Sequence, residues 1–117
     1  MTRCWAMDPE HPRLLPHQRL RVWGRAVALA RLCSKRPPRD LELRDQALRA
    51  AKSLALNIAE GASLSGRSRS RYFRIARASL VEVAAAYELA EALGDKPPDI
   101  ANLIDETYAM LSKLMQA

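Results

Sequence analysis

Residues 68–94, SRSRYFRIARASLVEVAAAYELAEALG, decide the fold because their apolar residues recur at helical spacing. Positions three and four residues apart lie on one face of an α-helix, whereas a half-buried strand would alternate apolar and polar residues. The pattern predicts a helix from about Ser68 or Ser70 to Leu93, closed by Gly94. Its buried seam is expected to comprise Phe73, Ala76, Leu80, Val83, Tyr87 and Ala90.

Three further helices are predicted on either side of this segment. The first is expected to start near His17 and to stop at the prolines 37–38. The second is expected to take Asp40 as its N-cap and Gly61 as its C-terminal cap, and the last to open at residues 97–99. Four helices joined by short loops predict an all-α fold, an antiparallel up-down-up-down four-helix bundle.

The length and composition fit a single helical domain. The chain has 117 residues, of which 49% are apolar, 27% charged and only 5% aromatic. Because prolines recur in residues 1–16, that stretch is predicted to be an irregular N-terminal arm, and residues 17–117 the bundle domain. Cys4 and Cys33 lack the spacing of a metal or redox motif, and Cys33 is expected in the core. With no apolar run long enough for a signal peptide or a membrane span, a cytoplasmic protein with no membrane partner is expected.

The basic residues are concentrated in two of the predicted helices. The chain carries a net charge of +6, which favours a polyanionic partner. Arg67, Arg71, Arg74 and Arg77 are predicted on one exposed stripe, where cations oppose the helix dipole. In the predicted topology the first and third helices run parallel, so a second group should lie at the same end: Arg19, Arg21 and Arg25. These arginines, with nearby serine hydroxyls and free N–H groups, suit phosphate. A merely solvated charged face is the alternative.

A second row of the helix within residues 68–94 is apolar on the side away from the seam. We call it the apolar stripe, and its members are Ala78, Val81, Ala85, Leu89 and Ala92. A helix that is apolar nearly all round is normally buried, and a continuous exposed apolar strip marks an interface. The stripe therefore predicts a homo-oligomer, although alanines, which make up three of its five residues, are also tolerated by solvent.

No arrangement of residues indicates an enzyme, a metal site or a cofactor site. His11 and His17 have no cluster of further ligands at suitable spacing. No histidine and acid are placed to activate any of the serines at positions 63–70, and the glycines at 61 and 66 lack the lysine of a phosphate-binding loop. Glu60 and Glu82 are expected to form salt bridges to arginines of the third helix. We therefore expect a non-enzymatic protein without a cofactor.

Two short motifs carry a resemblance to a known family. They are LNIAEG at residues 56–61 and YFRIARASLVE at residues 72–82. Together they resemble the four-helix bundle proteins encoded by intervening sequences of bacterial 23S ribosomal RNA genes. That family is similar to the accessory variability proteins of diversity-generating retroelements, which are basic pentameric rings. The motif residues are Asn57, Glu60, Gly61, Ser79 and Glu82. For Asn57, Glu60 and Gly61 a structural role is expected, with hydrogen bonds to the following loop and a turn at Gly61.

The resemblance implies an assembly and a class of partner. It implies a homopentameric ring that acts with RNA and with a reverse transcriptase or another protein. Together with the charge distribution, it predicts a non-enzymatic protein that binds nucleic acid, structured RNA rather than DNA, through its arginines. The alternative is a protein-interaction scaffold whose basic pole docks an acidic protein. An enzyme with a site assembled between subunits is the third and least favoured hypothesis.

Overall fold

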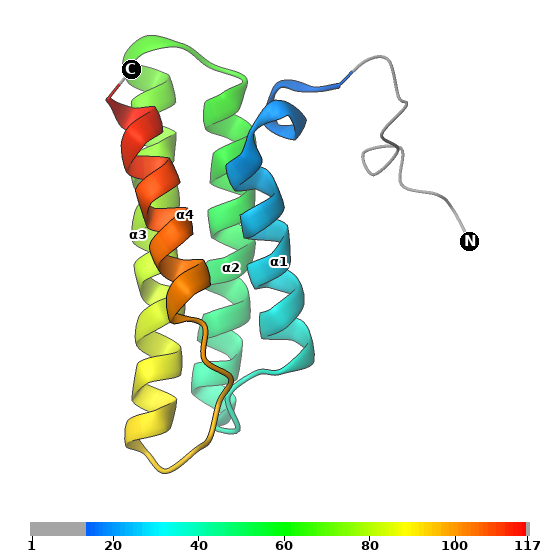
Figure 1. The fold of residues 1–117 in the computed structure, drawn as a ribbon, viewed down its shortest axis with the longest axis vertical. Coiled ribbons are helices and arrows are strands. Elements are labelled where there is room, and N and C mark those ends of the chain that lie inside the picture. The colour runs from blue at the N-terminus through cyan, green and yellow to red at the C-terminus, as the bar shows by residue number, and fades with distance from the viewer. Residues whose placement is uncertain (1–13, 117) are drawn as a thin grey trace, which may run out of the picture.

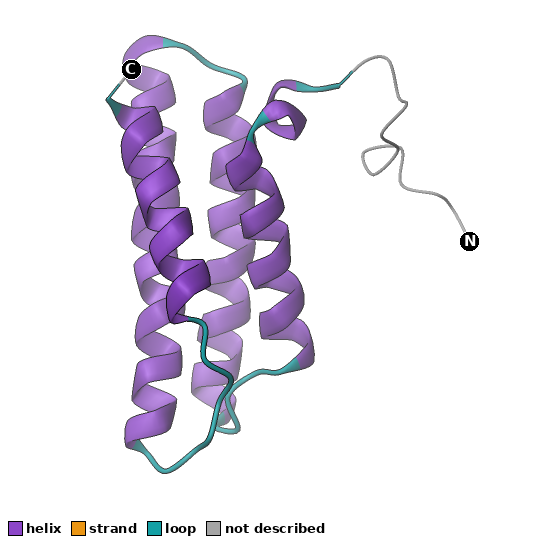
Figure 2. Ribbon diagram, in the orientation of Figure 1, coloured by secondary structure: helices purple, strands orange, loops and turns teal. Residues whose placement is uncertain are grey.

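The structure, a computed structural model, describes residues 14–116, and within that range it contains helices and no strands (Figure 2). The elements in chain order are a short 3-10 helix, η2 (Pro16–Arg19), and the helices α1 (Arg21–Lys35), α2 (Leu41–Ala62), α3 (Gly66–Ala92) and α4 (Ala101–Met115). The predicted all-α fold with four helices is therefore confirmed. Most of the arm predicted for residues 1–16, with Cys4 and His11, lies outside the described residues.

The four helices lie side by side along the long axis of the molecule, and successive helices are joined at alternating ends (Figure 1). The most extensive packing is between α2 and α3, while α1 packs on α2 and α4, and α4 packs on α3 and α1. Helices α1 and α3 therefore lie diagonally across the bundle. Both begin toward the same end, where the loop between α2 and α3 also lies (Figure 1).

The core is built on the predicted seam of α3. All six predicted residues are buried, and Phe73 and Leu80 are fully enclosed. They pack against residues of the neighbouring helices, among them Leu29, Leu54, Ile58 and Leu111. Burying a side chain of this size contributes roughly 1.5–3 kcal/mol. The hydrophobic seam that the sequence predicts therefore forms part of the buried core between the helices.

The first helix begins later than predicted. Pro16 opens the 3-10 turn η2, and Leu20 then adopts an extended backbone conformation with φ −91° and ψ 129°. The side-chain oxygen of Gln18 accepts a hydrogen bond from the backbone N–H of Leu15 at 2.6 Å, which stabilises this short turn. Regular α-helix therefore starts at Arg21, and the expectation of a continuous helix from His17 is wrong.

The start of α2 is capped as predicted. The carboxylate of Asp40 accepts a hydrogen bond from the backbone N–H of Leu43 at 3.0 Å, and Glu42 lies in the first turn. Replacement of Asp40 by alanine is expected to lower the free energy of unfolding by about 0.5–2 kcal/mol, because one helix N–H loses its partner. Urea denaturation followed by circular dichroism measures this change. Asp40→Asn keeps an acceptor and should stay close to the parent; equal losses in both variants would contradict the capping role.

Gly61 does not end α2, in contrast to the prediction. The helix continues through Gly61 to Ala62, and Gly61 is buried. A Cβ atom at this position would lie 2.9 Å from two ring carbons of Phe73 and 3.2 Å from the carbonyl oxygen of Arg69. The absence of a side chain at Gly61 therefore allows α2 and α3 to approach closely, which only the tertiary structure reveals.

The end of α3 follows the prediction. Gly94 has φ +98°, a left-handed conformation that glycine adopts without strain. Its N–H donates to the carbonyl of Glu91 at 3.0 Å, and the N–H of Asp95 donates to the carbonyl of Ala90 at 3.0 Å. These two bonds form a Schellman motif.

In the described part of the chain, no helix is long and apolar enough to cross a membrane.

Candidate nucleic-acid interface

Three of the predicted arginines line an exposed row at the start of α3. Arg67, Arg71 and Arg74 are all exposed, and we call them the arginine stripe. Together with Gly66 and Ser70 they line a shallow hollow of about 630 Å³. Within residues 14–116, the ion pairs closer than 4.0 Å join Arg25 to Glu106 and Arg39 to Asp95, so no described carboxylate neutralises the stripe. Its guanidinium groups are available to an external anion.

The N-terminus of α3 adds to the positive potential of the arginine stripe. Ser65, the N-cap of α3, makes no side-chain hydrogen bond to the helix, and the first turn contains no acidic residue. The first N–H groups of α3 therefore lack a side-chain acceptor, and the helix dipole adds positive potential beside Arg67. Both features oppose a nearby cation and favour a bound anion, for which helix N-termini are common sites.

Arg77 does not belong to the arginine stripe, although the sequence places it there. It is half-buried, its Nη1 donates to Ser112 Oγ at 2.9 Å, and its guanidinium lies 5.1 Å from the ring centroid of Tyr108. Three residues advance a helix by about 300°, which turns Arg77 about 60° away from Arg74 and toward α4. Arg77 therefore joins α3 to α4 rather than extending the anion-binding surface.

Arg69, which the sequence analysis did not single out, also has a structural role. Its guanidinium lies 4.8 Å from the centroid of the Phe73 ring, and its Nη1 donates to the carbonyl of Ala62 at 3.3 Å. That carbonyl is at the C-terminal end of α2, where helix carbonyls lack partners in the helix itself. Arg69 thus covers the close contact between α2 and α3, behind the exposed arginine stripe.

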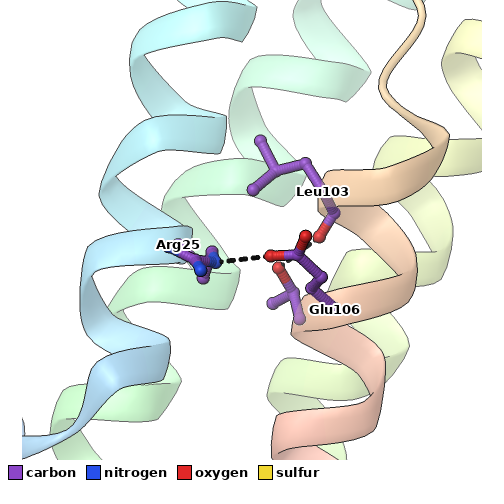
Figure 3. A network of polar contacts seen from close by, with 4 residues as sticks. Arg25, Leu103 and Glu106 are labelled. Carbon is purple, nitrogen blue, oxygen red and sulfur yellow. Dashed lines mark hydrogen bonds and ion pairs between the residues drawn. The ribbon is translucent and has the colours of Figure 1, made fainter.

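The predicted arginines of η2 and α1 form a separate patch. Arg25 bridges α1 to α4 through an ion pair in which Arg25 Nε lies 2.9 Å from Glu106 Oε2 (Figure 3). Arg19 and Arg21 are exposed and line a hollow of about 360 Å³ with Lys113 from the last turn of α4. The expectation of one continuous basic pole is therefore only partly met. Two cationic surfaces face the same end of the bundle, but on diagonal helices.

The motif residues lie mainly in the contact between α2 and α3. Ser53 Oγ and Ser79 Oγ are 2.9 Å apart, and Asn57 Nδ2 donates to Ser53 Oγ at 3.1 Å and to the Ser53 carbonyl at 2.8 Å. These bonds satisfy polar groups in a largely apolar interface, as buried polar groups require. Asn57 therefore bonds within its own helix and not to the following loop, because α2 continues past it.

The two motif glutamates are exposed. The main-chain carbonyl of Glu60, rather than its carboxylate, accepts bonds from the N–H and hydroxyl of Ser63. Neither Glu60 nor Glu82 forms one of the ion pairs found within residues 14–116. The expected salt bridges to arginines of α3 are therefore wrong, since neither carboxylate lies within 4.0 Å of a described cation.

The apolar stripe continues the arginine stripe along the same side of α3. All five of its residues are exposed, and Val81 and Leu89 each retain 51% of their accessible surface. The spacing of three and four residues runs unbroken from Arg74 through Ala78 to Val81. One side of α3 is thus cationic in its first turns and apolar in its later turns.

The buried nucleophiles are held in an unreactive state. Burial raises the pKa of the Cys33 thiol, which disfavours the reactive thiolate. Burial also raises the pKa of Tyr87, whose hydroxyl donates to the carbonyl of Arg36 at 3.0 Å. No group of three or more His, Cys, Asp or Glu residues within 14–116 is arranged to hold a metal ion.

The fold and surface define a class of small four-helix proteins with a basic helical face. The sequence matches the family model of the 23S rRNA-intervening sequence proteins over residues 18–117, so the chain belongs to that family. This confirms the resemblance seen in the two motifs. A comparison with curated proteins found no match.

Proposed function

We propose that this protein is a non-enzymatic RNA-binding protein that holds phosphates with the arginine stripe. The observation that carries the proposal is the combination of three exposed arginines, without a described carboxylate partner, and an uncapped helix N-terminus beside them. Guanidinium groups bind phosphate through two parallel hydrogen bonds, and this geometry favours arginine over lysine. Arg19, Arg21 and Lys113 form a second, smaller contact surface at the same end.

The composition of the surface favours contacts to the backbone of a folded RNA. Phosphate contacts fix position without reading sequence, whereas single-stranded recognition depends on bases stacked on exposed aromatic rings. No aromatic side chain lines the hollow beside the arginine stripe. The preferred ligand is therefore a folded nucleic acid that is bound with low sequence specificity. The family resemblance favours structured RNA over DNA, and binding is expected to take place in the cytoplasm.

The working unit in this proposal is a homo-oligomer of antiparallel bundles, a ring of five copies by family resemblance. Support comes from the exposed apolar stripe, since a continuous apolar strip on a helix favours an interface. Repetition of the arginine stripe around a closed ring multiplies the phosphate contacts. Such a ring suits an accessory role in a ribonucleoprotein or beside a reverse transcriptase.

Fluorescence anisotropy with a labelled RNA hairpin, and with duplex DNA beside it, tests the binding proposal. The double variant Arg71→Ala/Arg74→Ala is expected to bind the hairpin about 10-fold to 100-fold more weakly, which corresponds to about 1.4–3 kcal/mol. The matched control is Arg44→Ala/Lys96→Ala, which removes two exposed charges at the opposite end of the bundle. It should bind nearly as the parent does.

Equal losses in the two double variants would reduce the effect to overall charge and contradict a role for the arginine stripe. Unchanged affinity in Arg71→Ala/Arg74→Ala would contradict it directly. If the parent fails to bind either nucleic acid at low salt, the cationic surface instead serves to dock an acidic protein, the alternative function.

A further inference from the structure

A groove between α1 and α2 has an apolar floor and a cationic rim. Its volume is about 440 Å³, and no acidic residue lines it. The floor is formed by Val27, Ala30 and Leu48, which are half-buried, and the rim by exposed side chains. The rim residues are Arg31, Ser34, Lys35 and Lys52. None of these three cations forms one of the ion pairs found within residues 14–116.

The apolar stripe of α3 has the complementary chemistry. Val81 and Leu89 project from it with about half of their surface exposed. Glu82 and Glu88 flank it, are exposed, and make no ion pair with any described residue. One surface is thus apolar with a cationic border, and the other apolar with an anionic border. This is the arrangement of an interface with an apolar centre and a polar rim.

The two surfaces also lie at the same level along the bundle. The contact between Ser53 and Ser79 places these two residues side by side, and α2 and α3 run in opposite directions (Figure 1). With equal rise per residue, Leu48, five residues before Ser53, lies level with position 84. On α1, the bond from Tyr87 to the Arg36 carbonyl fixes the level in the same way, which places Arg31 level with Glu82.

We propose that the apolar stripe of one copy packs into the groove between α1 and α2 of a second copy. A sideways displacement combined with a rotation about the long axis of the bundle, without an axial shift, then brings the stripe opposite the groove and Glu82 opposite the cationic rim. The groove borders α1, and the stripe lies on α3, which is diagonal to α1, so one copy offers a different surface to each of two neighbours. Contacts of this head-to-tail kind close into a ring when the rotation between neighbouring copies closes, and extend into an open filament when it does not. The inference rests on the homo-oligomer in the proposed function.

The arginine stripe lies outside the apolar contact in this packing. Arg67, Arg71 and Arg74 precede the apolar stripe on α3, toward the end of the bundle where α3 begins. The groove lies at the level of the later turns, so the apolar contact with the neighbouring copy is limited to those turns. The assembly therefore gathers the arginine stripes of several copies at one end.

Light scattering on the full chain at micromolar concentration, with size-exclusion chromatography, tests the pairing. Val81→Asp is expected to reduce the measured mass to that of the 13.1 kDa monomer. Ala109→Asp is the control, because Ala109 is an exposed apolar residue of α4 and belongs neither to the groove nor to the apolar stripe. It should keep the mass of the parent. Circular dichroism verifies that both variants are folded.

A charge exchange makes the test specific to this pair of surfaces. Glu82→Arg and Arg31→Glu should each weaken assembly, and the two together should restore it, since opposite charges again face one another. A monomeric parent would contradict the homo-oligomer itself, whatever the RNA result. An oligomeric parent whose mass survives Val81→Asp and both charge reversals would overturn the groove pairing and leave the assembly intact.

Discussion

Gly61→Ala is expected to be about 1–3 kcal/mol less stable to unfolding than Gly24→Ala, because the new methyl group overpacks the contact between α2 and α3. Its Cβ would meet the Cδ1 and Cε1 atoms of Phe73 at 2.9 Å, closer than real Cβ atoms approach. Phe73 is fully buried, and the guanidinium of Arg69 lies against its ring, so the ring has little room to move. Urea denaturation followed by circular dichroism measures the difference.

The comparison with Gly24 isolates packing from helix propensity. Both glycines lie within helices, and alanine is favoured over glycine there by about 1 kcal/mol. A Cβ at Gly24 would meet nothing within 4 Å, so Gly24→Ala should gain that propensity without strain. Equal stability of the two alanine variants would show that the close approach at Gly61 is not limiting.

A second substitution tests whether Phe73 is the cause. Phe73→Leu removes the ring, so Gly61→Ala should cost less in that background than in the parent. Contacting residues commonly show coupling energies of about 0.5–3 kcal/mol in such double-mutant cycles. Additive losses would assign the strain to another neighbour, such as the carbonyl of Arg69 at 3.2 Å.

The elements that the sequence predicts correctly are those set by local physics. The seam from Phe73 to Ala90 follows from helical spacing, the N-cap at Asp40 from its side-chain oxygen, and the end of α3 from the conformational freedom of Gly94. Each depends on residues within a turn or two. The packing role of Gly61 cannot be predicted in this way, because it is set by Phe73, twelve positions away on another helix.

The candidate site shows the same division between local and long-range contacts. The exposure of Arg67, Arg71 and Arg74 was predictable from spacing on one helix. The hydrogen bonds of Arg77 to Ser112 and of Arg25 to Glu106 could not be predicted, since these partners lie 35 and 81 positions away in the sequence. The position of Lys113 in the second basic patch could not be predicted either, because Lys113 is far from Arg19 and Arg21 in the sequence.

The surface features differ in how far the sequence can predict them. The arginine stripe and the apolar stripe share one spacing, so their union on one side of α3 could have been read from the sequence. The groove could not, because its walls come from α1 and α2 and exist only after those helices pack. Interfaces built from two elements carry no single periodic signal.

The RNA affinity of the assembled protein is expected to fall about a thousandfold between about 50 and about 200 mM salt. Each neutralised phosphate on B-form DNA contributes about −0.9 to the slope of log affinity against log salt, and the same value is taken here for the paired stem of an RNA hairpin. Arginine stripes from two neighbouring copies, with three arginines each, give about six such contacts and a slope near −5. Fluorescence anisotropy with a labelled hairpin across a salt series measures this slope.

The Val81→Asp variant, if monomeric, separates the contribution of one copy from that of the ring. With about three phosphates neutralised, its slope should be near −3 and its affinity should fall only about 40-fold over the same range. Equal slopes in an oligomeric parent and a monomeric variant would mean that a single copy makes all the phosphate contacts. A shallow slope in the parent would show that the arginines do not neutralise phosphate, because exchange of condensed counterions is what makes the dependence steep.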